Sequence, residues 1–439
     1  IILFVLLAVF FPGRSLIWFN ATKDWIAENF SWLYIVSMTG FLVFALYLCF
    51  SKFGDIRLGH KGERPEFPTI TWFAMLFSAG MGIGMLFWGV AEPMYHFLYP
   101  PHAAGGSLEA ARQGMGITLF HWGFHAWALY ALVALALAYF GFRRGLPLSF
   151  RSVFFPIFGD RIHGRIGDVI DIMAVLATLF GLATSLGLGA KQVNAGLNFV
   201  FGMPMGTNYQ VIIIFSITAM AVVSLISGLN AGIRRLSEIN MGIAAFLLLF
   251  LFILGPSTVY LLNALVENTG TYLQRIPTHS FWTATYDEGD KFSWFGGWTV
   301  FYWGWWIAWS PFVGMFIARV SRGRTIRQFI IGVLVVPTAV GIIWMTGFGN
   351  SALHQEIYDQ VAPGTDVAEV KAQLTAELGQ APTEAQLKEG LAEYYGYAPH
   401  EYSVWVTDPD TGKPLTVEGG DWPLAIPNST AVAKPRYYL

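Results

Sequence analysis

Long apolar runs separated by short polar segments recur from residue 1 to about residue 350. A helix needs about 20 apolar residues to cross a bilayer. The pattern predicts membrane spans near residues 1–11, 30–51, 70–92, 114–140, 168–200, 208–228, 238–264, 296–320 and 327–350. The first run is too short to span, and residue 1 already lies inside it, so we expect the chain to begin partway through a helix.

Composition places the chain among membrane proteins. It is 55% hydrophobic, 16% aromatic and only 12% charged, with a mean hydropathy of +0.51, outside the balance of soluble domains. The net charge of −2 and the absence of a basic run make nucleic acid an unsuitable partner. The single cysteine, Cys49, lies in an apolar run and is interpreted as a packing residue.

Basic residues gather in alternate loops, whereas the intervening loops are poor in lysine and arginine. By the positive-inside rule, the basic loops face the cytoplasm. Arg319, Arg322, Arg324 and Arg327 most simply anchor topology, although sensing of anionic lipid or ionic strength is an alternative for their loop. The basic residues of all these loops are Lys52, Arg57, Lys61, Arg64, Arg143, Arg144, Arg151, Arg161, Arg165, Arg234, Arg235, Arg319, Arg322, Arg324 and Arg327.

Beyond residue 351 the character of the chain changes. Acidic residues outnumber basic ones, and no apolar run is long enough to span. The stretches "TDVAEVKAQLTAEL" and "PTEAQLKEGLAEYYG" have capping residues and helical periodicity, so they predict a small ordered insert.

Glycines interrupt the span near residues 70–92, in the stretch "SAGMGIGMLFWGVAEP". Gly80, Gly82 and Gly84 each cost about 1 kcal/mol of helix stability relative to alanine. We therefore predict a broken helix around Gly80, Met81, Gly82 and Gly84, of the kind that lines transporter sites. Close helix packing through small residues is the alternative.

Two spans carry clustered aromatic residues within their length. In "LFHWGFHAWALYAL", Trp122, Trp127 and Tyr130 fall on one broad side of a helix. In "FYWGWWIAWSPF", Trp305, Trp306 and Trp309 do the same. Two facing aromatic walls would form a box, whereas an interfacial belt would place such residues singly at span ends.

An aromatic box without an acidic residue suits a quaternary ammonium ion. Such a cation has no N–H to donate, and each aromatic face contributes about 0.5 to 2 kcal/mol when desolvated. The sequence therefore predicts a binding site for trimethylammonium compounds.

Ionisable residues also stand within spans, among them Glu92, His121 and His125. Glu92, directly before Pro93, is expected to end its helix near the outer surface, with a gating role as the alternative. His121 and His125 have the spacing of a metal-ligand pair, but no acidic or cysteine partner lies nearby in sequence. We therefore interpret the two histidines as hydrogen-bonding groups between helices.

Four stretches resemble the betaine/choline/carnitine transporter family: "GMGIGMLFWGVAEP", "FHWGFHAWALY", "SLGLGAKQ" and "FYWGWWIAWSPFVGMFIARVSRGRTIR". The resemblance extends to about residue 350 and implies an all-α polytopic membrane protein of a bacterial plasma (inner) membrane. It implies LeuT-like inverted five-helix repeats after two leading helices, and commonly a homotrimer. The family moves glycine betaine, choline, carnitine, ectoine and related solutes.

The resemblance divides the chain into five parts, and about nine of the family's twelve membrane helices are expected, so that the sequence is interpreted as a fragment. Residues 1–69 hold the leading helices and a cytoplasmic loop, and residues 70–264 the first repeat. Residues 265–295 form an extracytoplasmic connection, residues 296–351 the first two helices of the second repeat, and residues 352–439 an acidic extracytoplasmic insert.

Carried across residue by residue, the family's aromatic box falls on Trp122, Trp127, Tyr130, Trp305, Trp306 and Trp309. Members with "GMGIG" are typically sodium-coupled importers, and some proton-driven choline carriers have aspartate at the position of Gly84. The resemblance implies one sodium site at the carbonyls of Ser78 and Met81. A second matches Thr178, Leu182 and Phe312, where Leu182 departs from the family's threonine.

The expected function is import of a quaternary-ammonium or zwitterionic solute of the glycine betaine type, coupled to sodium and without another cofactor. Proton-coupled choline uptake and exchange of a related solute remain alternatives. A channel would need a ring of selectivity groups, and a membrane enzyme a nucleophile or metal cluster with a base. The sequence offers neither, so no catalytic residue is predicted.

Overall fold

The computed structural model describes residues 2–80, 82–103, 105–226, 234–287, 294–358 and 364–383, together with Gln386. Within these residues the regular elements are helices, apart from one isolated antiparallel bridge between Arg57 and Thr325. Five described helices are long and apolar enough to cross a membrane, or six if one bent pair counts as a single span. The chain is thus an all-α polytopic membrane protein, as predicted.

A nine-residue helix precedes the first long helix. α1 (Ile2–Phe10) ends before Pro12, which occupies the first turn of α2 (Pro12–Phe50), where its missing N–H costs nothing. The predicted spans at 1–11 and 30–51 correspond to α1 and to the second half of α2. The intervening polar residues continue α2, which the apolar pattern alone did not predict.

The buried centre of the molecule is a set of helices contributed by distant parts of the chain. α6 packs against α14 and α15, α15 packs against α4, and α4 packs against α5. The elements are α3 (Thr69–Gly80), α4 (Ile83–Leu98), α5 (Leu108–Trp122), α6 (Phe124–Ala138), the π-helical turn η5 (Gly296–Val300), α14 (Phe301–Val320) and α15 (Ile326–Tyr358).

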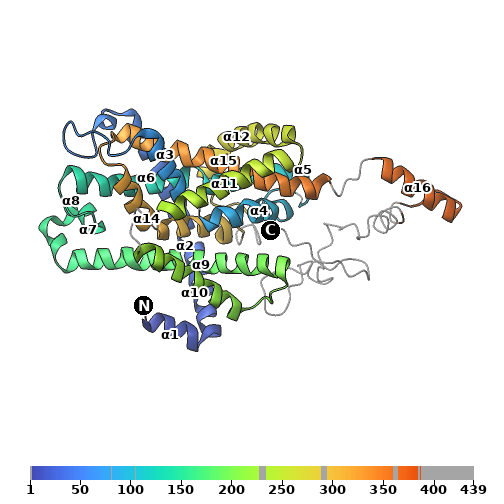
Figure 1. Cartoon of the computed structure of the whole chain (residues 1–439), viewed down its shortest axis with the longest axis horizontal. Helices are drawn as coiled ribbons and strands as arrows, with labels where there is room; N and C mark the ends of the chain where they lie inside the picture. The colour runs from blue at the N-terminus through green and yellow to red at the C-terminus, as the bar shows by residue number, and fades with distance from the viewer. Residues whose placement is uncertain are drawn as a thin grey trace.

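Two long helices lie on one side of this centre and expose most of their apolar residues. α9 (Arg165–Phe201) packs against α14 and α10 (Thr207–Ile226), and only a small part of either apolar stretch is buried (Figure 1). The chain reaches α9 from α6 through η2 (Tyr139–Arg143), α7 (Phe150–Val153), α8 (Phe155–Phe158) and η3 (Gly159–His163).

A sharp bend divides the predicted span at 238–264. The chain bends by 113° between α11 (Arg234–Leu254) and α12 (Thr258–Ser280), with Gly255 and Pro256 between them. A Gly-Pro pair ends helices, because proline cannot continue the hydrogen-bond ladder. The predicted span therefore contains a sharp bend, and residues 265–280 of the expected connection are helical.

Part of the acidic insert is helical in the described residues. α15 continues to Tyr358, past the boundary predicted at residue 352. α16 (Gly364–Leu378) confirms the helix predicted from "TDVAEVKAQLTAEL". The second predicted helix, at residues 382–396, falls almost entirely outside the described residues.

Three of the basic loops meet at one end of the bundle. Next to the Arg57–Thr325 bridge, the N–H of Leu58 donates to the carbonyl of Arg324 at 2.8 Å, and the N–H of Gly323 donates back to Leu58 at 2.7 Å. Arg143, from the loop after α6, donates to the carbonyl of Gly59. We call the paired segments 56–66 and 319–326 the loop clamp.

Ion pairs reinforce the loop clamp. Arg322 pairs with Glu63 at 2.6 Å and Arg319 with Glu66 at 2.8 Å. The backbone N–H of His60, together with Arg322, lowers the pKa of Glu63 below its usual value. The remaining basic loop, which holds Arg234 and Arg235, lies outside the residues whose side chains are described.

Candidate functional site

A helix interruption opens the candidate site. α3 ends at Gly80 and α4 begins at Ile83, with Gly82 extended and no side chain capping the new helix. Met81 lies outside the described residues. A Cβ on Gly84 would lie 3.0 Å from Cη2 of Trp122 and 3.3 Å from Cη2 of Trp305. Glycine at this position therefore lets the α4 backbone approach two indoles closely.

A second interruption, at Gly123, separates α5 from α6. The N–H of Phe124 donates to the hydroxyl of Tyr272 from α12 at 2.7 Å. Nε1 of Trp306 donates to the carbonyl of His121 at 3.0 Å. Side chains from two other helices thus satisfy backbone groups at this break, as buried backbone requires.

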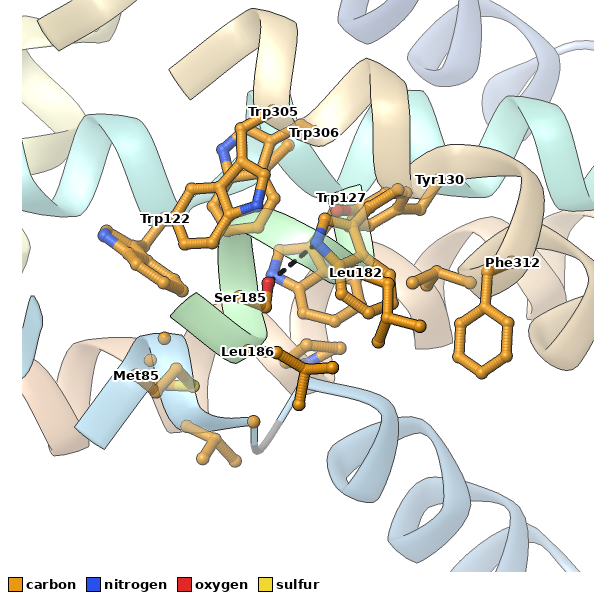
Figure 2. Close-up of a pocket in the computed structure, with 18 of the residues that line it drawn as sticks. Met85, Trp122, Trp127, Tyr130, Leu182, Ser185, Leu186, Trp305, Trp306 and Phe312 are labelled. Atoms are coloured by element: carbon orange, nitrogen blue, oxygen red, sulfur yellow. Dashed lines mark hydrogen bonds between the residues drawn. The ribbon is translucent and has the colours of Figure 1, made fainter. Parts of the chain in front are cut away.

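The six aromatic residues of the predicted box line one cavity of about 400 Å³ (Figure 2). Trp305 and Trp306 stack with ring centroids 5.2 Å apart and planes only 8° from parallel. Trp122 meets Trp306 edge to face at 4.8 Å, and Trp127 meets Tyr130 at 5.6 Å. The structure therefore brings together residues that lie up to 187 positions apart, between Trp122 and Trp309.

The rest of the cavity wall is apolar and uncharged. Among the described residues, no charged side chain lines it. Ser185 contributes the hydroxyl that accepts from Nε1 of Trp309 at 3.0 Å (Figure 2). The other lining residues are Gly82, Gly84, Met85, Ala126, Leu182, Leu186, Ile217, Phe312, Val313, Pro337, Val340 and Gly341.

Three of the box indoles have their N–H groups occupied by protein acceptors. Nε1 of Trp122 donates to Glu92, that of Trp306 to the carbonyl of His121, and that of Trp309 to Ser185. Nε1 of Trp305 is buried without a hydrogen-bond partner. A buried donor without a partner costs about 1 to 3 kcal/mol, so this N–H is a destabilising feature of the structure.

A polar network lies behind Trp122, and it corrects the prediction for Glu92. α4 continues to Leu98, and Glu92 is fully buried instead of ending the helix at the outer surface. Oε2 accepts from Nε1 of Trp122 at 2.8 Å and from the hydroxyl of Tyr302 at 2.5 Å. Oε1 lies 2.6 Å from Nδ1 of His121 and 3.4 Å from Nε2 of His96.

The two histidines of the predicted pair have separate partners. Nε2 of His121 lies 3.0 Å from the Thr299 hydroxyl, whereas Nε2 of His125 lies 2.9 Å from that of Ser280 on α12. These bonds join helices, as predicted. The missing acidic partner of His121 exists, however, in Glu92, and the possible ligand atoms of Glu92, His96 and His121 all lie within 4.8 Å of one another.

The positions carried over for sodium are described only in part. Met81 and the side chain of Ser78 lie outside the described residues. The Thr178 hydroxyl donates to the carbonyl of Ala174 in its own helix, and Thr178 does not line the cavity. Leu182 and Phe312 line it with apolar side chains, so Thr178 is the only one of these three positions with a side-chain oxygen.

Sequence reasoning missed Tyr302, His96, Thr299 and Ser185. Tyr302 stands inside the tryptophan-rich stretch, so its place in a site could have been suspected. A carboxylate within an apolar span is by default a functional candidate, and this signal would have directed attention to Glu92. Ser185 offered no sequence signal.

The fold and the cavity together define a polytopic membrane protein with an aromatic cavity among broken helices. The family model described as "BCCT, betaine/carnitine/choline family transporter" matches residues 1–389, so the chain belongs to this family. Members are transporters, not enzymes, and are multi-pass proteins of the inner membrane, which places this chain there.

Several curated relatives resemble the chain over most of its length. The osmo-dependent choline transporter BetT2 of Acinetobacter baylyi is 46% identical over 349 residues, or 80% of this chain and 50% of the relative. A glycine betaine transporter of the same organism is 45% identical over 82% of this chain and 54% of its own length. The high-affinity choline transport protein of Escherichia coli (strain K12) is 44% identical, with 82% and 53% covered. The chain therefore spans about half the length of these relatives.

Proposed function

We propose that the protein is a secondary active transporter that imports a quaternary-ammonium or zwitterionic solute of the glycine betaine type. The observation that carries the proposal is the cavity lined by five tryptophans and one tyrosine, without a charged side chain in its described wall. A trimethylammonium group gains about 0.5 to 2 kcal/mol from each desolvated aromatic face. An ordinary ammonium substrate would instead gain most from a carboxylate, which the described wall lacks.

The polar end of the solute would meet two kinds of donor. Nε1 of Trp305 has no protein partner. The first N–H groups of α4 have no side-chain cap, and Gly82 at its start lines the cavity. Because a helix N-terminus carries partial positive charge, it suits a carboxylate. This arrangement favours a solute with a cationic head and an anionic or hydroxyl tail.

The relatives support this solute class without choosing among its members. Two of those compared are named as choline transporters and one as a glycine betaine transporter. Their names leave the net charge of the solute open, because choline is a cation and glycine betaine is a zwitterion. Proton-coupled choline uptake therefore remains the second candidate.

For the coupling ion we propose sodium, held at the break between α3 and α4. Of the positions carried over for it, Met81 falls between α3 and α4 in sequence, and Ser78 precedes it by three residues. Sodium bound there would hold the broken segment in its binding shape and so lower the free-energy cost of solute binding. By linkage, the solute would tighten sodium binding by the same factor.

Transport would proceed by alternating access, with one helix group rocking about the cavity. The homotrimer implied by the family resemblance is likewise a proposal. Light scattering of the full-length protein in detergent tests it, and a monomeric mass would contradict it.

The decisive experiment is a solute titration of the full-length purified protein, followed by its tryptophan fluorescence, in sodium chloride and in potassium chloride. We expect a saturable shift with glycine betaine that requires sodium. A shift indifferent to sodium would retain the cavity assignment and overturn sodium coupling. No shift with betaine, choline, carnitine or ectoine would overturn the proposed function.

Uptake into proteoliposomes then separates the transport classes. A carrier saturates and concentrates the solute against a gradient, whereas a channel only equilibrates it. Recovery of chemically unchanged solute from the vesicles would agree with the family's character as transporters.

A further inference from the structure

A buried carboxylate lies directly behind one wall of the cavity. Glu92 contacts Trp122 through the 2.8 Å hydrogen bond from Nε1 to Oε2, and Tyr302 donates to the same oxygen. An indole N–H can only donate, so Oε2 is held as an acceptor. Any proton that neutralises this network must therefore reside on the other side of the carboxylate, toward His121.

His121 can take up that proton without losing a hydrogen bond. Its Nδ1 faces Oε1 of Glu92 at 2.6 Å, and its Nε2 faces the Thr299 hydroxyl at 3.0 Å. A threonine hydroxyl both donates and accepts. The same contact therefore serves a neutral imidazole that accepts at Nε2 and an imidazolium that donates there.

The neighbouring histidines do not have this freedom. His96 and His125 each have a buried Nδ1 without a partner, so a second proton would create a buried, unpaired donor. Among the described residues, the titratable groups that surround His121 are Glu92 and His96 on α4, His125 on α6, Tyr302 on α14 and His279 on α12. Glu92 is the only carboxylic acid in this set.

We infer that Glu92 and His121 form a proton-binding site whose occupancy selects between cationic and zwitterionic solutes in the cavity. This inference rests on the proposed function. With one proton the pair carries a net charge of −1, and with a second proton it is neutral. Among the described residues no charged side chain lines the cavity, so the pair acts on it from behind Trp122 without a competing charge in the wall.

The negative pair favours choline. A cation without its own anion is attracted by the buried negative charge behind Trp122. The hydrogen bond from Nε1 to that carboxylate also raises the electron density of the indole face that the cation contacts. Glycine betaine carries its own carboxylate, which cancels most of this gain. One unit charge about 10 Å away at an effective dielectric of about 20 changes affinity on the order of tenfold.

The test measures choline and glycine betaine binding to the full-length protein by tryptophan fluorescence across about pH 5 to pH 8, where histidines ordinarily change charge. We expect choline affinity to fall roughly tenfold toward acid pH, with betaine affinity changing by less than about twofold. His121→Asn places an amide N–H at the position of Nδ1 and removes the proton site. It should retain tight choline binding at every pH.

Two further variants make the outcome specific. Glu92→Gln removes the charge while keeping an acceptor for Trp122, and should weaken choline on the order of tenfold at alkaline pH with little effect on betaine. His125→Gln is the matched control, since His125 is equally buried, lies one turn away and does not contact Glu92. It should keep the wild-type pH profile.

The outcomes separate this inference from the proposed function. A choline-to-betaine affinity ratio that is constant with pH in the wild type, or a shift that persists in His121→Asn, would overturn the proton-binding site. Failure of both solutes to bind the wild type at any pH would instead overturn the proposed function. If Glu92→Gln does not fold, the wild-type and His121→Asn profiles still decide.

Discussion

Two helix interruptions border the cavity, and they are satisfied in different ways. At Gly82, between α3 and α4, an added Cβ would meet no atom within 4 Å, and the residue lines the cavity. At Gly123, between α5 and α6, an added Cβ would lie 2.2 Å from the Tyr272 hydroxyl and 2.5 Å from the Leu119 carbonyl oxygen.

The difference separates two uses of the same residue type. The break at Gly123 is closed by the protein, because Tyr272 and Trp306 occupy the backbone groups beside it. At Gly82 no side chain caps the new helix and, among the described residues, only the N–H of Met85 donates to the Gly82 carbonyl, at 3.2 Å, so the space beside this break remains open to a bound species. A glycine in a membrane helix can thus either let a side chain from another helix pack against the backbone or leave room for a ligand.

The largest expected effect is on stability, from Gly123→Ala. Its methyl group would overlap both Tyr272 and the backbone, and overpacking of this kind costs about 1 to 3 kcal/mol or more. We expect a clear loss of thermal stability in detergent, or no folded protein. Gly82→Ala is the matched control and should fold normally; equal losses in the two variants would contradict the comparison.

The next effect is on solute affinity, from Trp306→Ala. Trp306 lines the cavity and also donates to the carbonyl of His121 at the closed break. We expect at least roughly tenfold weaker solute binding, from the lost aromatic face, together with reduced stability. Trp306→Phe should recover most of the affinity and little of the stability. Trp303→Phe, at a fully buried indole outside the cavity wall, should leave affinity unchanged.

A smaller effect is expected at the open break, from Gly84→Ala. The methyl group would press on Cη2 of Trp122 and of Trp305, displacing them by a few tenths of an ångström and weakening solute binding several-fold. Gly84→Asp should impair betaine uptake more strongly. Gly341→Ala is the control, since this lining glycine has its nearest atoms at 3.9 Å. Undiminished betaine uptake by Gly84→Asp would refute this account of the open break.

The smallest effect is expected from Tyr272→Phe. It removes the acceptor for the Phe124 N–H, which is only partly buried, so the cost is about 1 kcal/mol. Thermal unfolding should shift slightly, and solute affinity should not change. A large affinity change without a stability change would mean that Tyr272 acts on the cavity instead of closing the break.

The aromatic side of the site was accessible from sequence, because helical periodicity is local. Trp305, Trp306 and Trp309 share a helix face by spacing alone, and the family resemblance placed the second wall opposite them. The interruption between α3 and α4 was likewise predicted from the closely spaced glycines Gly80, Gly82 and Gly84.

The polar side was not accessible, since it depends on contacts between distant residues. Glu92 before Pro93 resembles a helix end, because proline disrupts helices, yet Pro93 lies inside α4. The partner Tyr302 lies 210 residues away. Gly123 gave no signal beyond a single glycine, since its reason is Tyr272 on α12. The bend at Gly255 and Pro256 could have been predicted from the Gly-Pro pair, but the apolar run continues across it and was interpreted as one span.

The loop clamp has a consequence for the order of synthesis. Arg57 donates to the carbonyl of Gly323, a residue 266 positions later in the chain. At about 5 to 20 residues per second, the ribosome needs on the order of 10 to 50 s to bridge that gap. During this interval the first basic loop exists without its partner. The early helices must therefore be inserted and retained in the membrane before the contact that joins them to α14 and α15 can form, and chaperones or lipids have that time in which to act on them.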